Sequence, residues 1–550
     1  MSSNNSFDRG MNRRSFLTAV GLSSTAVGLG LGTTGCSGAT SVPADGAGEI
    51  SDSVLPRYVP VTYAEPDFPS QNESPPGYAK APEQLVQSVT QTPGTGRTIN
   101  AMTPLWGTIP RTDGNKYFEA VNEMLGSEIR FQIVDAYTYG DKISTVLASP
   151  DDVPDWVQIL DYMQPPTFAS DVLPHVFEDL SPYLSGNAVR EYPNLANIPT
   201  DAWRMAVWNN KIYAIPKPSA PISNVIFYRG DLFAEMGVDP AVRSGEEFLD
   251  LLKEINNPGN NQWAIEDPWD GATLFHSVTN WRLDENGKLL NRVETPEYRA
   301  ALEWAARAYE AGVVHPDAVA GNKEGAKTRF QSGQSLVMID GPGGWAEALR
   351  DNLAANPSYS QRPFNFFSAD GAADPVYWKG NAAGMYSFVK QADDKEKVKE
   401  ILRLANAMAA PFGTTEFQLI RFGVEGVHYT LDADGAPVPT ERAARELQPT
   451  YQFLADAPAA EFQYQYPGYV EAYCEWAIAN GTYLQEPLFY GMHISEPMEY
   501  ASLGQPFEDL QADIPRGRRS INDLDAAIDQ WRASGGDQLR AFYQDILDRG

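Results

Sequence analysis

Residues 128–160 read EIRFQIVDAYTYGDKISTVLASPDDVPDWVQIL, and the fold class of the 550-residue chain follows from this stretch. Apolar and polar residues alternate from Glu128 to Ile133, which is typical of a half-buried strand. A helical pattern follows over residues 142–147, and Pro154 then leads into Trp156–Leu160, a predicted short buried strand. A strand, a helix and a second strand in succession predict an α/β fold with largely parallel sheets.

The rest of the chain repeats this alternation of strands and helices. Two further short strands are predicted at residues 224–229 and 335–340. Helices with capping and stop residues are predicted at residues 295–312, 393–411 and 520–536. At roughly 100–200 residues per domain, a chain of this length is too long for one core, so two or more lobes are expected.

The first residues have the pattern of an export signal. Residues 12–18, NRRSFLT, match a twin-arginine signal, and a glycine-rich apolar stretch follows that is too short to span a membrane. Cys36 follows small residues and resembles a lipoprotein cleavage site, which predicts a signal peptide over residues 1–35 and lipidation at Cys36. The alternative is an ordinary cleaved signal with an incidental cysteine, and either Met1 or Met11 could be the start. The expected location is outside the cytoplasm, on the membrane surface.

The next segment, residues 36–97, is rich in serine, glycine, alanine and proline. Its prolines break any helix or central strand. This composition predicts a flexible tether between the lipid anchor and the folded body, and partial order within the tether remains possible.

The charge of the chain restricts its partners. The sequence holds 42 Lys+Arg against 72 Asp+Glu, a net charge of −30. Such a surface repels phosphate backbones and other anionic polymers, so nucleic-acid binding is not expected. The same charge favours a neutral ligand over an anionic one. The two cysteines cannot form a disulfide framework.

Five segments carry a resemblance to a known family. They are residues 141–155 (DKISTVLASPDDVPD), 177–184 (FEDLSPYL), 211–238, 330–342 (FQSGQSLVMIDGP) and 423–430 (GVEGVHYT). Together they resemble extracellular solute-binding proteins of ABC importers, family 1 sugar-binding type, and within it the LipO and alginate-binding lipoprotein subgroup. The resemblance implies a two-lobed, periplasmic-binding-protein-like α/β fold (type II) with a hinge between the lobes and a ligand cleft at their interface.

The resemblance also implies how the chain divides between the lobes. The first lobe is expected to hold residues 98–208 and 336–390. The second lobe is expected to hold residues 209–335 and 391–550.

A cleft for a sugar needs aromatic faces for the ring C–H groups and polar side chains for the hydroxyls. Trp106 lies after a predicted first strand, Asp161 follows the strand Trp156–Leu160, and Trp269 lies between two aspartates. Maltose-type members of the family often carry a stacking aromatic directly after Gly-Pro, whereas here Gly343 and Gly344 take that place and Trp345 comes two positions later. A tryptophan is more often a core residue than a ligand contact. The candidate ligand-binding residues are Trp106, Asp161, Trp208, Trp269, Trp281, Trp345, Tyr377 and Trp378.

No metal, cofactor or catalytic group is expected. Residues 284–287 and 432–435 resemble calcium loops for a few positions, but Asn-Gly or Asp-Gly between short strands more often marks a hairpin turn. The sequence holds no Gly-x-Ser-x-Gly, His-Glu-x-x-His or phosphate-binding loop, and its five histidines are scattered.

The function that we expect is a substrate-binding lipoprotein of an ABC transporter, which captures a carbohydrate, an oligosaccharide, for import. Its partners are the sugar, the transmembrane subunits of a permease and, through the lipid, the membrane. It is expected to be a monomer and not an enzyme. The alternatives are a secreted glycoside hydrolase using two carboxylates and a surface adhesin that binds carbohydrate.

Overall fold

The computed structural model describes residues 50–165, 167–322, 325–494 and 496–549. The predicted signal peptide and Cys36 lie outside these ranges. Within the described ranges, none of the helices combines the length and the apolar character needed to cross a membrane.

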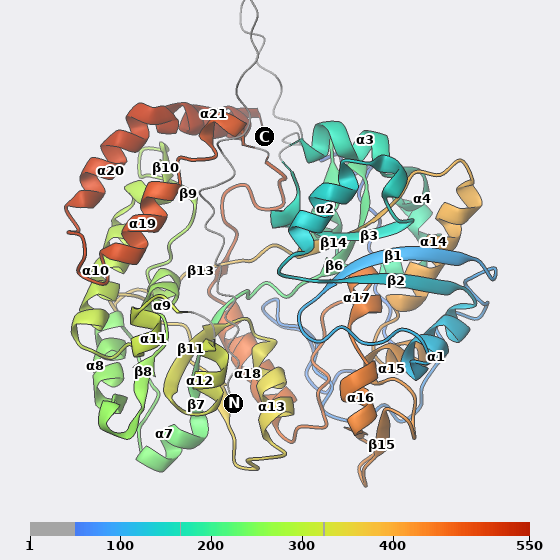
Figure 1. The fold of residues 1–550 in the computed structure, drawn as a ribbon, viewed down its shortest axis with the longest axis horizontal. Helices are drawn as coiled ribbons and strands as arrows, with labels where there is room; N and C mark the ends of the chain where they lie inside the picture. The colour runs from blue at the N-terminus through green and yellow to red at the C-terminus, as the bar shows by residue number, and fades with distance from the viewer. Residues whose placement is uncertain (1–49, 166, 323–324, 495, 550) are drawn as a thin grey trace, which may run out of the picture. The chain divides into compact units, whose positions relative to one another are not determined.

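The first large sheet contains the strands predicted at residues 128–133 and 156–160, and both predictions are confirmed. Its order is β2-β1-β3-β14-β6, with β1 parallel to β2 and β3 and with β14 antiparallel to β3 and β6. The five strands are β1 (Thr98–Leu105), β2 (Glu128–Asp135), β3 (Trp156–Leu160), β6 (Ala214–Pro218) and β14 (Ala383–Val389). We call this sheet and the helices packed on it lobe 1 (Figure 1).

The helices of lobe 1 bury apolar faces against this sheet. In α1, the Asn115 side chain accepts hydrogen bonds from the amides of Tyr117 and Phe118, and Gly126 ends the helix in the left-handed conformation. These helices are α1 (Lys116–Leu125), α2 (Tyr139–Leu147), α14 (Lys395–Met408), α15 (Thr415–Phe422) and α17 (Thr450–Leu454). A single apolar core joins the sheet to these helices.

The second large sheet belongs to lobe 2 and has the order β12-β7-β11-β8. Its strands are β7 (Val225–Arg229), β8 (Trp263–Ile265), β11 (Ser335–Asp340) and β12 (Gln361–Pro363). The helices around it include α8 (Gly245–Ile255), α9 (Pro268–Phe275), α10 (Pro296–Glu310), α13 (Gly344–Asn352) and α18 (Tyr469–Gly481). As predicted, Thr295 caps α10, since its hydroxyl accepts a hydrogen bond from the Tyr298 amide.

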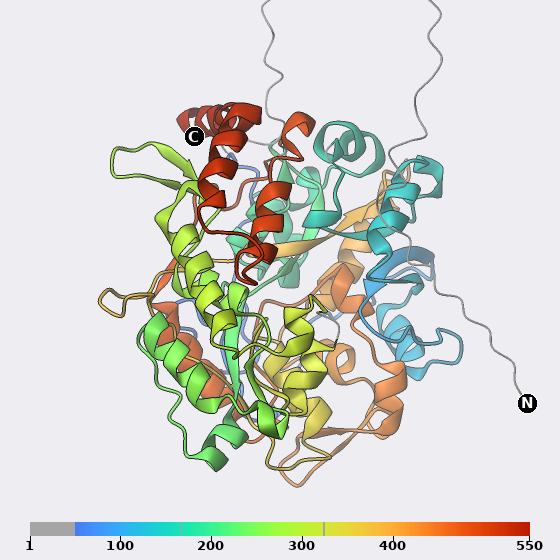
Figure 2. The same cartoon turned by 60° about the vertical axis from the view of Figure 1, so that its left-hand side comes forward.

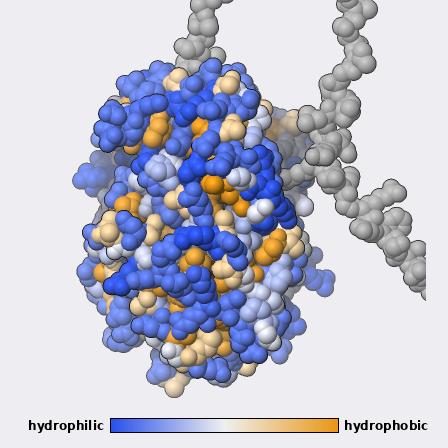
Figure 3. Space-filling model, turned by 90° about the vertical axis from the view of Figure 1, so that its left-hand side faces the viewer, coloured by the Kyte–Doolittle hydropathy of each residue, from blue (hydrophilic) through white to orange (hydrophobic). Residues whose placement is uncertain are grey.

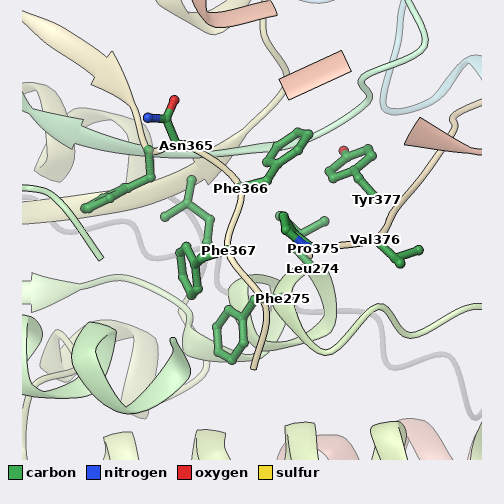
Figure 4. Close-up of a pocket in the computed structure, with 10 residues that line it drawn as sticks. Leu274, Phe275, Asn365, Phe366, Phe367, Pro375, Val376 and Tyr377 are labelled. Carbon is green, nitrogen blue, oxygen red and sulfur yellow. The ribbon is translucent and has the colours of Figure 1, made fainter. Parts of the chain in front are cut away.

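The core of lobe 2 is aromatic. The Trp304 indole stacks on Phe248 with the ring centroids 5.7 Å apart and donates to the Gly245 carbonyl at 2.7 Å. A small cavity of about 20 Å³ lies among phenylalanine side chains in this region (Figure 4). Phe275, Phe366 and Phe367 line this cavity, which has room for about one water and none for a sugar.

Three helices complete lobe 2 at the end of the chain: α19 (Gln505–Asp513), α20 (Asp523–Trp531) and α21 (Asp537–Arg549). They share an apolar cluster with the hairpin of β9 (Trp281–Leu283) and β10 (Leu289–Asn291). Figure 2 shows these helices in red. Figure 3 faces the side of Figure 1 that carries α20, α10 and α8, where hydrophilic residues predominate and apolar ones form small patches.

The chain passes between the lobes in three crossing segments: residues 219–224, 379–382 and 455–468. The first two are bonded to each other, because the Ser219 amide donates to the Ala382 carbonyl and the Gly380 amide donates to the Pro221 carbonyl. Residues 219–224 and 379–382 are therefore paired through their backbones and together form one two-stranded hinge.

The strand pairings divide the chain differently from the expected boundaries. Residues 335–340 pair with β7 and β8, so most of the stretch 336–390 lies in lobe 2. Helices α14, α15 and α17 contribute to the core of lobe 1, so residues 391–454 lie there and not in lobe 2. Lobe 1 holds residues 98–218 and 383–454, and lobe 2 holds residues 225–378 and 469–549.

Residues 50–97, expected to be part of a flexible tether, are bonded to the body instead. Leu55 is buried in the core of lobe 1, and the Val59 amide donates to the Ala196 carbonyl. Further along, the Val86 amide donates to the Gly413 carbonyl. The prolines exclude regular structure as expected, but the backbone groups between them find partners on the folded body.

Candidate ligand-binding site

Three aromatic side chains are exposed at one edge of lobe 1. Trp106, Tyr137 and Tyr162 follow strands β1, β2 and β3 and are 40%, 86% and 72% exposed. Because these strands are parallel, their carboxyl ends meet at the same edge of the sheet, where α/β folds place ligand groups. Trp106 is among the residues predicted from the sequence, whereas Tyr137 and Tyr162 are not, although each of the three lies within two residues of a strand end.

Asp161 lies at the same edge, directly after β3. Burial raises the pKa of its carboxyl to about 6, and hydrogen bonds from Tyr386 and Asn381 oppose that rise. The Tyr386 hydroxyl donates to Asp161 Oδ2 at 3.3 Å. The carboxyl is therefore an acceptor held in place beside the hinge strand β14.

Asn381 also lines a cavity of about 780 Å³. This volume falls within the usual range of small-molecule sites, roughly 300–1,000 Å³. The hinge segment supplies one wall, and the β9–β10 hairpin and the C-terminal segments supply the rest. Its lining combines aromatic, amide and charged side chains, among them Trp281, Arg292, Trp378, Lys379, Asn381 and Tyr490.

Two predicted tryptophans line this cavity, and both are held in fixed orientations. The Trp378 indole donates to the Ser277 carbonyl at 2.7 Å. Trp281 packs on Tyr543 with the ring centroids 4.6 Å apart and is only 5% exposed. A rigid aromatic ring loses little conformational entropy when a sugar stacks on it.

Lys379 is a positively charged residue of the hinge segment 379–382 that lines the cavity, and its side chain is 10% exposed. Its ammonium lies 2.6 Å from Glu73 Oε1 and 3.3 Å from Glu486 Oε1. Two carboxylates from distant parts of the sequence thus hold one ammonium at the cavity.

Three of the predicted site residues are enclosed in the core. Trp208, Trp345 and Tyr377 are 1%, 2% and 4% exposed. Trp208 stacks on His493, Trp345 packs against Tyr469, and the Tyr377 hydroxyl donates to the Asn224 carbonyl. In this arrangement they are core residues and present no ring face to a ligand.

Trp269 is half-buried at the start of α9. Its backbone amide donates to the capping carboxylate of Asp267, and its indole packs edge-on against Tyr298. The structure therefore brings Trp281, Trp378 and, through Asn381, Asp161 together, while Trp106 lies on the open edge of lobe 1 and Trp269 lies on α9.

The two calcium-like sequences are hairpin turns, as predicted. Asp284 Oδ1 accepts from the amides of Asn286 and Lys288 between β9 and β10. Asp432 Oδ1 accepts in the same way from two amides between β15 (Tyr429–Leu431) and β16 (Pro437–Pro439). Backbone amides thus use the carboxylate oxygens that would bind a cation.

Comparison with known proteins identifies the fold. Residues 115–410 match the family model described as "Bacterial extracellular solute-binding protein". The chain belongs to this family. This solute-binding protein is 23% identical to lipoprotein LipO of Bacillus subtilis (strain 168) over 481 aligned residues. The alignment covers 81% of this chain and 91% of LipO.

A second relative of this solute-binding protein is the polygalacturonan/rhamnogalacturonan-binding protein YtcQ of the same Bacillus subtilis strain. It is 20% identical, over 66% of this chain and 75% of YtcQ.

Solved solute-binding proteins share the architecture. The N-glycan transport solute-binding protein NgtS of Streptococcus pneumoniae matches with a TM-score of 0.61 at 16% identity, over 82% of this chain and 98% of NgtS. The alginate-binding protein AlgQ2 matches with a TM-score of 0.58 at 14% identity, over 85% of this chain and all of AlgQ2. These matches confirm the predicted two-lobed solute-binding fold.

Proposed function

We propose that this solute-binding protein captures an oligosaccharide and delivers it to the transmembrane subunits of an ABC importer. The observation that carries this proposal is the cavity of about 780 Å³ at the hinge, lined by fixed tryptophans and amide side chains. Aromatic faces cover the apolar faces of pyranose rings, and amide and carboxylate groups pair with hydroxyls. The exposed aromatic edge of lobe 1 extends this surface for further sugar units.

Within the site, Trp378 provides the inner stacking face, Trp281 forms part of the cavity wall, and Trp106 provides an outer stacking face. Asp161 and Asn381 accept hydrogen bonds from ligand hydroxyls at the hinge. Trp269 contributes from lobe 2 when the lobes close, with Trp208, Trp345 and Tyr377 packed behind these groups. NgtS is an N-glycan transport solute-binding protein and YtcQ is a polygalacturonan/rhamnogalacturonan-binding protein, and both support a carbohydrate ligand.

The protein acts by binding and release, without chemical conversion of the ligand. It works as a monomer, held outside the cytoplasm by a lipid on Cys36. Hinge movement at residues 219–224 and 379–382 encloses the sugar between the lobes.

Tryptophan fluorescence, titrated with a panel of neutral and acidic oligosaccharides, tests the proposal. We expect a saturable change with one class of saccharide and no release of reducing sugar during the titration. Turnover of a glycoside would instead show a hydrolase. Binding without loss of sugar uptake on deletion of the gene would show an adhesin.

A further inference from the structure

The proline-rich segment of residues 54–89 runs from lobe 1 to lobe 2 and then returns to lobe 1. It begins on lobe 1, where the Arg57 amide donates to the Gly186 carbonyl. It ends on lobe 1, where the amides of Ser88 and Val89 donate to the carboxylate of Glu416. Between these two attachments, residues 68–77 lie on lobe 2.

The part of the segment on lobe 2 is closely fitted to α18. The Asn72 side-chain amide donates to the Ile478 carbonyl at 2.9 Å. A Cβ at Gly481 would lie 2.0 Å from the Asn72 carbonyl oxygen, and a Cβ at Gly77 would lie 2.3 Å from Cys474 Sγ. Both positions require glycine because the backbone of the segment and α18 are in direct contact.

The same segment touches two of the three crossing segments. Glu73 pairs with Lys379 at 2.6 Å, directly after Trp378 on the cavity wall. On the third crossing segment, the Glu461 amide donates to the Pro76 carbonyl, and the Tyr78 amide donates to the Glu461 carbonyl. The segment of residues 54–89 is thus bonded to both lobes, and its residues 68–78 are bonded to lobe 2 and to two crossing segments.

The loop holds its shape by internal bonds and at a cost in backbone strain. Phe68 and Gly77 exchange both backbone hydrogen bonds, and the Ser70 hydroxyl donates to the Ser74 carbonyl at 2.6 Å. Asn72 and Glu73, which present their side chains to lobe 2 and to Lys379, have φ values of 50° and 63°. Non-glycine residues keep this left-handed conformation where surrounding contacts impose it, and such strain is concentrated at functional positions.

We propose that residues 68–78 form a clasp that restrains the hinge, in which Glu73 is a positioning residue that fixes Lys379 at the ligand cavity. Residues 68–78 are bonded to lobe 2 and to two crossing segments, and Tyr78 stacks on Phe412 of lobe 1 with the ring centroids 4.1 Å apart, so some of these contacts must break when the lobes move apart. The clasp therefore restricts opening and keeps the hinge wall ordered before a ligand arrives, which lowers the entropic cost of binding. Its link to binding rests on the proposed function, whereas its link to the hinge does not.

Hydrogen–deuterium exchange of the full chain without ligand tests the clasp. The variant is Asn72→Ala with Glu73→Gln, and the readout is exchange at the bonded hinge amides of Ser219 and Gly380. We expect exchange there to become at least about fivefold faster, with peptides of β1 and β2 unchanged. The matched control is Lys80→Gln in the same segment, which removes only an 82% exposed side chain paired with Asp67 and leaves hinge exchange unchanged.

Unchanged hinge exchange in the double variant, with wild-type circular dichroism, would overturn the clasp. Faster exchange throughout the protein would also overturn it, because the loop would then be a general stabilising element. Glu73→Asp, which retains the charge, is expected to restore part of the wild-type hinge exchange relative to Glu73→Gln. If no saccharide binds the wild type, the proposed function fails while the exchange data still decide the clasp.

Discussion

The Trp208 indole and the His493 imidazole are stacked, with their centroids 4.1 Å apart and their planes 14° from parallel. His493 belongs to the C-terminal part of the chain, yet its Nε2 lies 2.6 Å from the Met205 carbonyl of lobe 1. Beside it, a Cβ at Gly491 would lie 2.7 Å from the Arg204 side chain. The segment around Met492, which lines the cavity, is therefore anchored to lobe 1 by a half-buried histidine.

This histidine should make stability depend on pH. Burial lowers the pKa of His493 to about 4, and its hydrogen bond to Met205 opposes that effect only in part. The unfolded chain takes up the proton near pH 6.5, so protonation favours unfolding as the pH falls from about 6.5 to 4. This pKa difference between the folded and unfolded states corresponds to about 3 kcal/mol of folding stability. That contribution is present at neutral pH and is lost as the pH falls toward 4.

Urea denaturation at pH 7 and pH 4.5 measures this effect. In His493→Phe, which keeps a ring against Trp208, the fall in the free energy of unfolding between the two pH values should be smaller than in the wild type. The control is His175→Phe at an exposed position, where the fall should match the wild type. An equal fall in His493→Phe and wild type would contradict the assignment.

Trp106 should contribute to affinity and little to stability. Its ring is 40% exposed and contacts Phe453 edge-on at 5.8 Å. Trp106→Ala removes a stacking face, so we expect calorimetric titration with the saccharide that binds to show about tenfold weaker binding, about 1.4 kcal/mol. Trp106→Phe should retain most of the affinity.

Leu431→Ala provides a matched control for this titration. Leu431 is 48% exposed in the β15–β16 hairpin and does not line the cavity. It should bind the saccharide like the wild type. Equal affinity of Trp106→Ala and wild type would remove Trp106 from the site, and Tyr137→Ala and Tyr162→Ala would then show whether the edge binds at all.

Local elements of this fold could be predicted from the sequence, and the partners of those elements could not. Thr295 and Pro296 define the start of α10 by short-range capping, and the apolar run at Trp156–Leu160 requires a buried strand. The run Ser335–Asp340 also forms a strand, as predicted. Its partners β7 and β8 are distant in sequence, and the pattern of apolar residues does not indicate which sheet a strand joins.

The candidate site shows the same limit. Trp106 and Asp161 could be chosen as candidates because each directly follows a predicted strand, and the carboxyl ends of parallel strands lie at one edge of the sheet. Trp208 and Trp345 have similar local context but are covered by residues far away in sequence, namely His493 and Tyr469. Exposure of a tryptophan is decided by such distant contacts.

Ligand affinity should depend on the ionisation of Asp161. Burial raises the pKa of this carboxyl to about 6, so it is ionised above that pH and protonated below it. A carboxylate is the stronger acceptor for sugar hydroxyls, so affinity should fall as the pH decreases from 7 to 5. Fluorescence titrations across this range should show the dependence in the wild type and a flat profile in Asp161→Asn. A flat wild-type profile would exclude Asp161 from ligand contact.

Glu294 should be essential for the docking of the C-terminal helices that border the cavity. Its side chain is 2% exposed, and both of its oxygens accept from Arg540 Nη2, at 2.6 and 2.7 Å. Burial alone would raise the pKa of Glu294, but hydrogen bonds from Arg540 and Arg532 outweigh burial and hold the pKa below its ordinary value. The carboxylate thus stabilises the fold above its ordinary pKa, and that contribution is lost as the pH falls through the lowered value.

Glu294→Gln leaves the Arg540 guanidinium without its main partner in a position that is 14% exposed. We expect about 3 kcal/mol lower stability in urea denaturation at pH 7, and a smaller difference from wild type below pH 4. Asp545→Asn is the control, since it removes an exposed pair with Arg549 on the same helix and should change stability by about 0.5 kcal/mol or less. Equal effects of the two substitutions would show that the buried pair contributes no more to docking than a surface pair.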